Sequence, residues 1–289
     1  MRVLIIGATG FLGKSLVEDF SVHNEVFAAD KYENVRGTHY IDLTKKGLVE
    51  ETFSRLKPEL VLLPASITGV DYCQRNQDAA WRVNTEGPKD VAVAAKKHGA
   101  FMVFYSTDYV FDGGNGPYTE EDRTGPINFY GKTKLEAERI IQKEIRRFLI
   151  IRTCSLYGWE KGGFNYAMQV LNASEDRRII RAVNDQFGTP TYVKNLSGIT
   201  LKLISDGKEG LFHAAGPDYL NRAEFAREIA SVFCLDKGLI VETATDQLGQ
   251  PAARPKKGGL KTDKLEAEAA LKTMCVREGL LAMKTMRGR

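Results

Sequence analysis

Cysteine is scarce in this 289-residue sequence, and its four copies lie far apart. No C-x-x-C pair occurs, and the four histidines form no ligand pattern with the cysteines. The sequence therefore gives no support to a zinc site. We expect reduced thiols in a cytoplasmic protein, and no bound metal. The cysteines are Cys73, Cys154, Cys234 and Cys275.

Long apolar runs and an excess of one charge are also missing. The longest apolar runs have the length of a strand, well short of the roughly 20 residues that a membrane helix needs. The first run leads directly into a glycine turn, so we do not expect a cleaved signal. The 41 basic and 37 acidic residues nearly balance and are dispersed, which argues against nucleic-acid binding. We expect neither a membrane nor a nucleic acid as partner.

The chain opens with a strand pattern that passes into a glycine-rich turn. The apolar run of residues 2–6 is typical of a buried parallel strand. Glycines at positions 7, 10 and 13 permit a tight turn, close approach of a pyrophosphate and close packing of helix on strand. The phosphates would bind at the helix N-terminus. The predicted cofactor-binding residues of this turn are Gly7, Thr9, Gly10, Phe11, Leu12 and Gly13.

A second apolar run, residues 25–29, ends at Asp30. An acid at this place suits the ribose hydroxyls of an adenosine. Its carboxylate would repel a 2′-phosphate, which favours NADH over NADPH. Lys31 leaves the alternative open, because it could turn toward such a phosphate. The sequence thus predicts NADH or NADPH as cofactor, with NAD favoured by Asp30.

Strand and helix patterns alternate through the first half of the chain. Further strands are expected at 39–43, 60–63, 100–105 and 148–152, and helices at 48–56, 78–98 and 130–145, with Gly87-Pro88 kinking or dividing the second helix. Such alternation predicts an α/β fold, a doubly wound parallel (Rossmann) sheet. At its strand ends, further cofactor contacts are expected from Asp42, Leu43, Ala65 and Ser66.

The pattern loosens after residue 155. We expect a dinucleotide-binding Rossmann domain over 1–155 and a mainly substrate-binding part over 156–289, with segments of the latter returning to the sheet. No internal repeat or low-complexity tract occurs.

Tyr130 and Lys134 are four residues apart at the start of the predicted 130–145 helix. Residues at this spacing lie on one face of a helix, so the lysine charge is expected to lower the pKa of the tyrosine. A tyrosine tuned in this way can give a proton to a carbonyl oxygen. Ser106 and Thr107 follow the 100–105 strand at the sheet edge where ligands bind. Together these groups predict NAD(P)-dependent carbonyl reduction.

The residues resemble the dTDP-4-dehydrorhamnose reductase family of extended short-chain dehydrogenase/reductases, nearly from end to end. The likeness is carried by Gly7 to Gly13, Val83-Asn84-Thr85-Glu86-Gly87-Pro88, Ser106-Thr107-Asp108-Tyr109-Val110-Phe111-Asp112-Gly113, Tyr130-Gly131-Lys132-Thr133-Lys134, Asp185 to Thr191, and Ala253-Arg254-Pro255-Lys256.

The resemblance implies roles for individual residues. Tyr130 would donate the proton, Lys134 would hold the nicotinamide ribose, and Thr107 would hydrogen-bond the substrate carbonyl. The substrate would be a nucleotide sugar, dTDP-4-dehydro-L-rhamnose, bound with the help of Ser106, Asp108, Asn84, Gln186 and Arg254. A homodimer is possible in the family; the glutamate that links some members through a metal is replaced by Ser15, so no metal is implied.

Two alternatives stay open. Another nucleotide-sugar epimerase or reductase would share the fold and the Tyr130/Lys134 pair. A non-catalytic regulatory subunit, resembling the β-subunit of methionine adenosyltransferase, would keep the same segments around Tyr109 and Tyr130.

Overall fold

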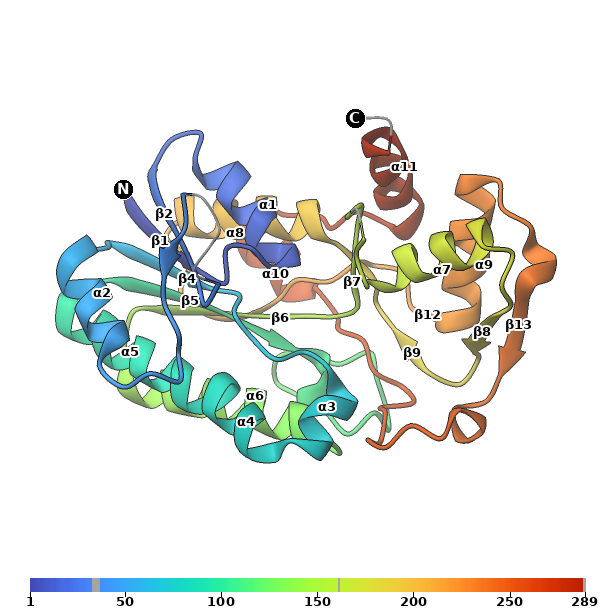
Figure 1. Ribbon diagram of the computed structural model, residues 1–289, viewed down its shortest axis with the longest axis horizontal. Coiled ribbons are helices and arrows are strands. Elements are labelled where there is room, and N and C mark those ends of the chain that lie inside the picture. Colours follow the sequence, from blue (N-terminus) through green and yellow to red (C-terminus); the bar gives the residue numbers. More distant parts are fainter. Residues whose placement is uncertain (33–36, 161, 288–289) are drawn as a thin grey trace.

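The computed structural model describes residues 1–32, 37–160 and 162–287. Its centre is a sheet in the order β11-β6-β5-β4-β1-β2-β3, with every neighbouring pair parallel (Figure 1). This arrangement confirms the predicted doubly wound fold class. In chain order the strands are β1 (Arg2–Ile6), β2 (Glu25–Asp30), β3 (His39–Tyr40), β4 (Leu60–Leu63), β5 (Phe101–Thr107), β6 (Phe148–Thr153) and β11 (Gly210–His213).

Helices cover both faces of the sheet (Figure 1). One face is covered by α2 (Leu48–Leu56), α5 (Gly87–His98) and α6 (Phe129–Glu144), preceded by α3 (Val70–Arg75), α4 (Gln77–Trp81) and the π-helical η1 (Arg82–Glu86). The other is covered by α1 (Phe11–Phe20), α8 (Val193–Ser205) and α10 (Asp263–Ala269). None of the helices described is long and apolar enough to cross a bilayer.

Every strand of the sheet except β3 contributes to two cores, because its side chains alternate between the faces. Ile6, Val61 and Phe104 pack toward α2, α5 and α6, whereas Ile5 and Leu62 pack toward α1 and α8. The strands are therefore apolar on both sides, which explains their continuous apolar runs.

The C-terminal part has a separate core around α7 (Tyr166–Glu175), α9 (Arg222–Phe233) and α11 (Val276–Met286). Its sheets have two strands each: β7 (Leu156–Tyr157) with β10 (Thr191–Tyr192), β9 (Phe187–Gly188) with β12 (Leu220–Asn221), and β8 (Ile180–Val183) with β13 (Ile240–Thr243). Short 3₁₀ segments are η2 (Asp108–Val110), η3 (Lys237–Leu239) and η4 (Thr245–Leu248).

Most expected elements are confirmed, and two differ in detail. The 39–43 strand is limited to β3, and the predicted 78–98 helix is divided by η1, which ends where Gly87-Pro88 begins α5. Proline is tolerated in the first turn of a helix, where its missing N–H removes no helical bond. Although β11 lies beyond residue 155, it pairs with β6; the domain boundary at 155 stays a prediction.

Candidate active site

The turn between β1 and α1 contains three glycines, and at two of these positions no larger residue fits. Gly7 has φ +94°, and a Cβ there would lie 2.6 Å from the backbone nitrogen of Ala65. A Cβ on Gly13 would lie 2.0 Å from the carbonyl oxygen of Gly7. The N-cap, Gly10, brings no side chain to the first-turn N–H groups of α1. This end of α1 therefore fits the phosphates of a dinucleotide.

Asp30 ends β2 beside this turn. Its Oδ2 accepts hydrogen bonds from the N–H of Thr9 at 3.1 Å and from the Thr9 hydroxyl at 2.7 Å, and its Oδ1 accepts from the N–H of Lys31 at 2.7 Å. The carboxylate is 8% exposed. Oδ1 accepts only one of these bonds and keeps a lone pair with which a ribose hydroxyl could be bound.

The remaining predicted cofactor residues surround the same turn. Asp42 is held by Thr44, and although burial acts to raise its pKa, the Thr44 hydrogen bonds and the nearby lysines bring that pKa below its usual value. Leu43 packs against Gly87, where a Cβ would lie 2.8 Å from that of Leu43. The N–H of Ala65 donates to the carbonyl of Ile6, which fixes the turn after β4 beside the turn after β1. Ser66 donates to the side chain of Asn84.

Thr107, Tyr130 and Lys134 come together at the carboxyl edge of the sheet. Thr107 ends β5, and Tyr130 follows the N-cap Asn128, whose side chain accepts from the Gly131 N–H at 2.9 Å. The Thr107 side chain shares a hydrogen bond with Tyr130. Lys134 lies one turn further along α6 and is 2% exposed.

Burial decides the charge state of Lys134. Its Nζ lies 3.9 Å from the centre of the Phe104 ring. Burial lowers the pKa of Lys134 to about 7, against the opposing influence of Glu138 and Cys73. The buried lysine therefore loses its proton far more readily than a solvated lysine does.

The expected lowering of the Tyr130 pKa by Lys134 is wrong. Burial raises the pKa of Tyr130, and the neighbouring Asp108 and Cys73 raise it further, against the hydrogen bond with Thr107. The spacing brings a cation onto the same helix face, but desolvation outweighs it, because the lysine is itself buried. Tyr130 thus keeps its proton at neutral pH.

Asp108 is a buried carboxyl with several donors around it. Cys154 donates to its Oδ2 at 3.1 Å, as does the Gly259 N–H at 3.2 Å, and Thr107 donates to its Oδ1 at 3.2 Å. Burial raises the pKa of Asp108 despite these bonds. Ser106 lies on β5, two residues before Asp108. Its hydroxyl is buried and has no hydrogen-bond partner among the described residues.

Asn84 belongs to the framework of the site. It is fully buried on η1; its amide oxygen accepts from the N–H of Ile67 at 2.8 Å and from Ser66, and its amide nitrogen donates to Thr133 on α6. These bonds tie the turn after β4 to α6, and the substrate contact expected of Asn84 stays a prediction.

Gln186 and Arg254 lie on the C-terminal side of the site. Gln186 donates to Thr245 and to Gln250, at 3.1 and 3.2 Å. Arg254 forms a bidentate ion pair with Asp71 of α3, with Nη1 3.0 Å from Oδ1 and Nη2 2.9 Å from Oδ2. Burial acts to raise the pKa of Asp71, but the Arg254 hydrogen bonds bring it below its usual value. Arg254 thereby fastens the C-terminal part to the Rossmann layer.

A small pocket of about 20 Å³ lies beside Asp108 and Gln186. Its wall includes Asp108, Tyr109 and Gln186, and also Arg222, which the sequence analysis missed. Arg222 begins α9 directly after the N-cap Asn221, whose capping box with Glu224 was readable from the sequence as a helix start. Nothing in that signal indicated that the arginine faces a pocket. The ring of Tyr109 meets that of Tyr130 edge-on, with 6.0 Å between the ring centres, so Tyr130 lies next to a residue of the pocket wall.

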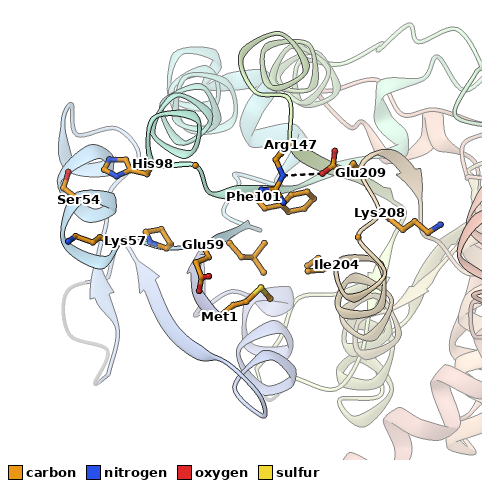
Figure 2. Close-up of a pocket in the computed structure, with 14 residues that line it drawn as sticks. Met1, Ser54, Lys57, Glu59, His98, Phe101, Arg147, Ile204, Lys208 and Glu209 are labelled. Atoms are coloured by element: carbon orange, nitrogen blue, oxygen red, sulfur yellow. Dashed lines mark ion pairs between the residues drawn. The ribbon is translucent and has the colours of Figure 1, made fainter.

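A much larger pocket, about 740 Å³, lies at the opposite, amino edge of the sheet. Figure 2 shows its apolar floor, with Phe101 and Ile204, and the Arg147–Glu209 ion pair of 3.5 Å at its rim. Cations at this edge follow the C-terminal ends of helices, where a positive charge complements the helix dipole. The residues expected to carry the chemistry, Thr107, Tyr130 and Lys134, lie at the carboxyl edge instead. Among the residues described, no group of three His, Cys, Asp or Glu side chains is arranged to hold a metal.

Comparison with known proteins agrees with this geometry. The family model described as RmlD substrate binding domain matches residues 1–286. The dTDP-4-dehydrorhamnose reductase of Escherichia coli (strain K12) is 33% identical, over 94% of this chain and 93% of that protein. The crystal structure of the Bacillus anthracis dTDP-4-dehydrorhamnose reductase in complex with NADP superposes with a TM-score of 0.92 at 31% identity, covering 99% of each chain.

A relative of another kind is also similar. Methionine adenosyltransferase 2 subunit beta of Rattus norvegicus is 30% identical over 92% of this chain and 81% of that protein. Because the family model covers almost the whole chain, the assignment does not depend on any one relative. The chain belongs to the RmlD substrate-binding domain family, the family of the dTDP-4-dehydrorhamnose reductases.

Proposed function

We propose that the chain reduces the 4-keto group of a nucleotide-linked deoxysugar, converting dTDP-4-dehydro-L-rhamnose into dTDP-L-rhamnose. Family membership makes the chain an NAD(P)-dependent oxidoreductase; the sugar is the part proposed here. The observation that supports it best is the meeting of Thr107, Tyr130 and Lys134 beside a pocket walled by Asp108 and Tyr109.

The cofactor would lie across the carboxyl edge of the sheet. The glycine turn and the start of α1 would hold its phosphates, and Asp30 would accept hydrogen bonds from the adenosine ribose. Because the Asp30 carboxylate would repel a 2′-phosphate, we propose NADH as the preferred cofactor. When bound, the nicotinamide supplies the hydride that reduces the carbonyl carbon.

Tyr130 would supply the proton. A raised pKa keeps its phenol protonated at neutral pH, which is the form needed to give a proton to the carbonyl oxygen as the C–H bond forms. Thr107 would hydrogen-bond the same oxygen, and Lys134 would hold the nicotinamide ribose. The carbonyl thus gains one hydride at carbon and one proton at oxygen.

The test is oxidation of NADH and NADPH, followed at 340 nm, with enzymatically generated dTDP-4-dehydro-L-rhamnose. Rapid oxidation, with NADH preferred, would support the proposal, whereas binding of the cofactor without oxidation would contradict it. Reduction of other nucleotide-linked keto-sugars in place of this one would retain the chemistry and reject the sugar.

A regulatory subunit is the second candidate, and the similarity to methionine adenosyltransferase 2 subunit beta favours it. Mixing the chain with a methionine adenosyltransferase catalytic subunit tests this. A stable complex, together with no oxidation of either cofactor, would support the regulatory role.

A further inference from the structure

A line of buried charged side chains runs from Lys134 into the protein. Glu138, one turn after Lys134 on α6, is 1% exposed, and Arg152 on β6 is 4% exposed. Arg152 donates hydrogen bonds to both carboxylate oxygens of Glu138, from Nε to Oε1 at 3.0 Å and from Nη2 to Oε2 at 2.7 Å. The guanidinium ends at His213, with Nη1 3.4 Å from Nε2. Burial lowers the pKa of His213 to about 3, so this histidine adds no charge at neutral pH.

Lys134 has a counter-charge but no partner for its N–H groups. Among the described residues, no acceptor forms a hydrogen bond or ion pair with its Nζ, which lies against the Phe104 ring. Burying an ammonium in this way is costly unless an anion compensates it. Glu138 is the principal group that opposes the effect of burial on Lys134.

The other elements around Lys134 supply little charge. Cys73 of α3 is the second group that favours the ammonium, but burial raises its own pKa to about 11, so its thiol is neutral at pH 7. The strand β5 contributes the Phe104 ring, and the η1 residues that hydrogen-bond to the neighbouring Thr133, Asn84 and Thr85, are uncharged. Tyr130, on the same helix, keeps its proton. Glu138 is therefore the source of negative potential at this lysine.

The ion pair with Arg152 explains why Glu138 forms no direct ion pair with Lys134. Residues four apart on a helix can form a direct ion pair, but both carboxylate oxygens are turned to the guanidinium. A bidentate arginine pair fixes the orientation of a carboxylate strongly. The lysine consequently feels the carboxylate through space and keeps its donors free for a ligand.

We propose that Glu138, oriented by Arg152, is a positioning residue that increases the charged fraction of Lys134 while leaving its N–H groups free to bind the nicotinamide ribose. The inference rests on the proposed function in assigning that ribose as the ligand. The effect of Glu138 on the charge of Lys134 does not depend on the proposed function.

Two neutralising substitutions should shift the pKa of Lys134 in opposite directions. Glu138→Gln removes the counter-charge and leaves Arg152 uncompensated, so the pKa of Lys134 should fall by about one. Arg152→Gln frees the carboxylate to pair with Lys134 directly, so that pKa should rise by about one. General damage to the site would not produce opposite signs.

The experiment is an NMR titration of cofactor-free protein carrying ¹³C-labelled lysine, with Lys134→Met used to assign the signal. Glu136→Gln serves as the matched control, because Glu136 lies on the same helix but is more than a third exposed, and it should leave the titration of Lys134 unchanged. A titration that stays unchanged in both Glu138→Gln and Arg152→Gln would overturn the proposal. Should Glu138→Gln fail to fold, the neutral double variant Glu138→Gln/Arg152→Gln replaces it, and the pKa of Lys134 should again fall.

The pH profile of kcat/KM supplies a second readout. Because reduction needs a charged Lys134, the alkaline limb should move to lower pH in Glu138→Gln and to higher pH in Arg152→Gln. Shifts in the titration without any reductase activity would reject the proposed function alone. Normal reduction with an unmoved titration would reject this inference alone.

Discussion

The two edges of the central sheet differ in a way that pocket size does not indicate. The amino edge has a pocket of about 740 Å³, and its charged side chains are open to solvent, with Arg147 68% and Glu209 47% exposed. The carboxyl edge has a pocket of only about 20 Å³. There Lys134 and Asp108 are buried and Tyr130 is half-buried, and desolvation makes their pKa values depart from the ordinary ones.

On the proposed function, desolvation of titratable groups marks the reactive edge better than pocket volume does. A solvated charge interacts weakly with its neighbours, whereas a buried one is sensitive to each of them. Substitutions at the carboxyl edge should therefore alter chemistry, and substitutions at the amino edge should not.

The largest effect is expected from Tyr130→Phe. Losing the proton donor should reduce turnover by about 10²–10⁴-fold while leaving cofactor affinity intact. Initial rates of NADH and NADPH oxidation with the keto-sugar measure this. Tyr72→Phe, at a tyrosine of α3 that is 47% exposed, is the matched control and should be normal. Near-normal turnover in Tyr130→Phe would remove the basis for distinguishing the two edges.

Asp30→Ala should weaken NADH binding by roughly tenfold or more, because hydrogen bonds to a charged acceptor are lost. NADPH should lose less, since the repulsion of its 2′-phosphate disappears as well. Fluorescence titration of both cofactors measures the two affinities, and Asp19→Ala on α1 is the control. Equal losses for NADH and NADPH would mean that another group, such as Lys31, sets the preference.

Lys134→Met should make the protein more stable. The pKa of Lys134 is about 7 in the folded chain against an ordinary 10.5. Below pH 7 the folded state bears the full cost of a buried charge; between pH 7 and 10.5 only the unfolded state binds the proton, so the stability of the parent chain rises with pH.

The methionine variant lacks this cost and should melt about 5 °C higher at pH 6, with the gain disappearing toward pH 10. Thermal unfolding of the cofactor-free protein at both pH values gives the comparison. Lys132→Met, at an exposed position of α6, should shift little. An equal gain at pH 6 and pH 10 would show that packing, and not charge, is responsible.

The smallest effect is expected at the amino edge. Lys57 and Lys208 line its pocket, and the double variant Lys57→Ala/Lys208→Ala should leave kcat/KM within about twofold of the parent, as surface substitutions usually do. Steady-state kinetics at fixed pH decide this. A large loss would show that the amino edge contributes to the reaction.

The Rossmann half was readable from the sequence because its signals are local. Continuous apolar runs predict buried parallel strands, and the helix expected at 48–56 is α2 as observed. The 130–145 helix is α6, shifted by one residue to Phe129–Glu144. The cofactor and substrate roles assigned to single residues stay predictions.

The C-terminal half was not readable to the same depth. Strands of two residues, such as β9 and β12, carry no periodicity, and their pairing depends on partners more than 30 positions away. Arg222 was missed for the same reason: its neighbours predict a helix start, and the pocket exists only after folding. The pKa of Tyr130 was misjudged because spacing reveals a neighbour but not its burial.

The buried thiols have a practical consequence for labelling. Reagents such as maleimides attack thiolates, and burial raises the pKa of both Cys73 and Cys154. Cys234, by contrast, is exposed at the end of α9. A fluorophore should therefore attach at Cys234 ahead of Cys73 and Cys154, placing a reporter on the C-terminal part; Cys275, which is half-buried, has to be replaced where a single label is wanted.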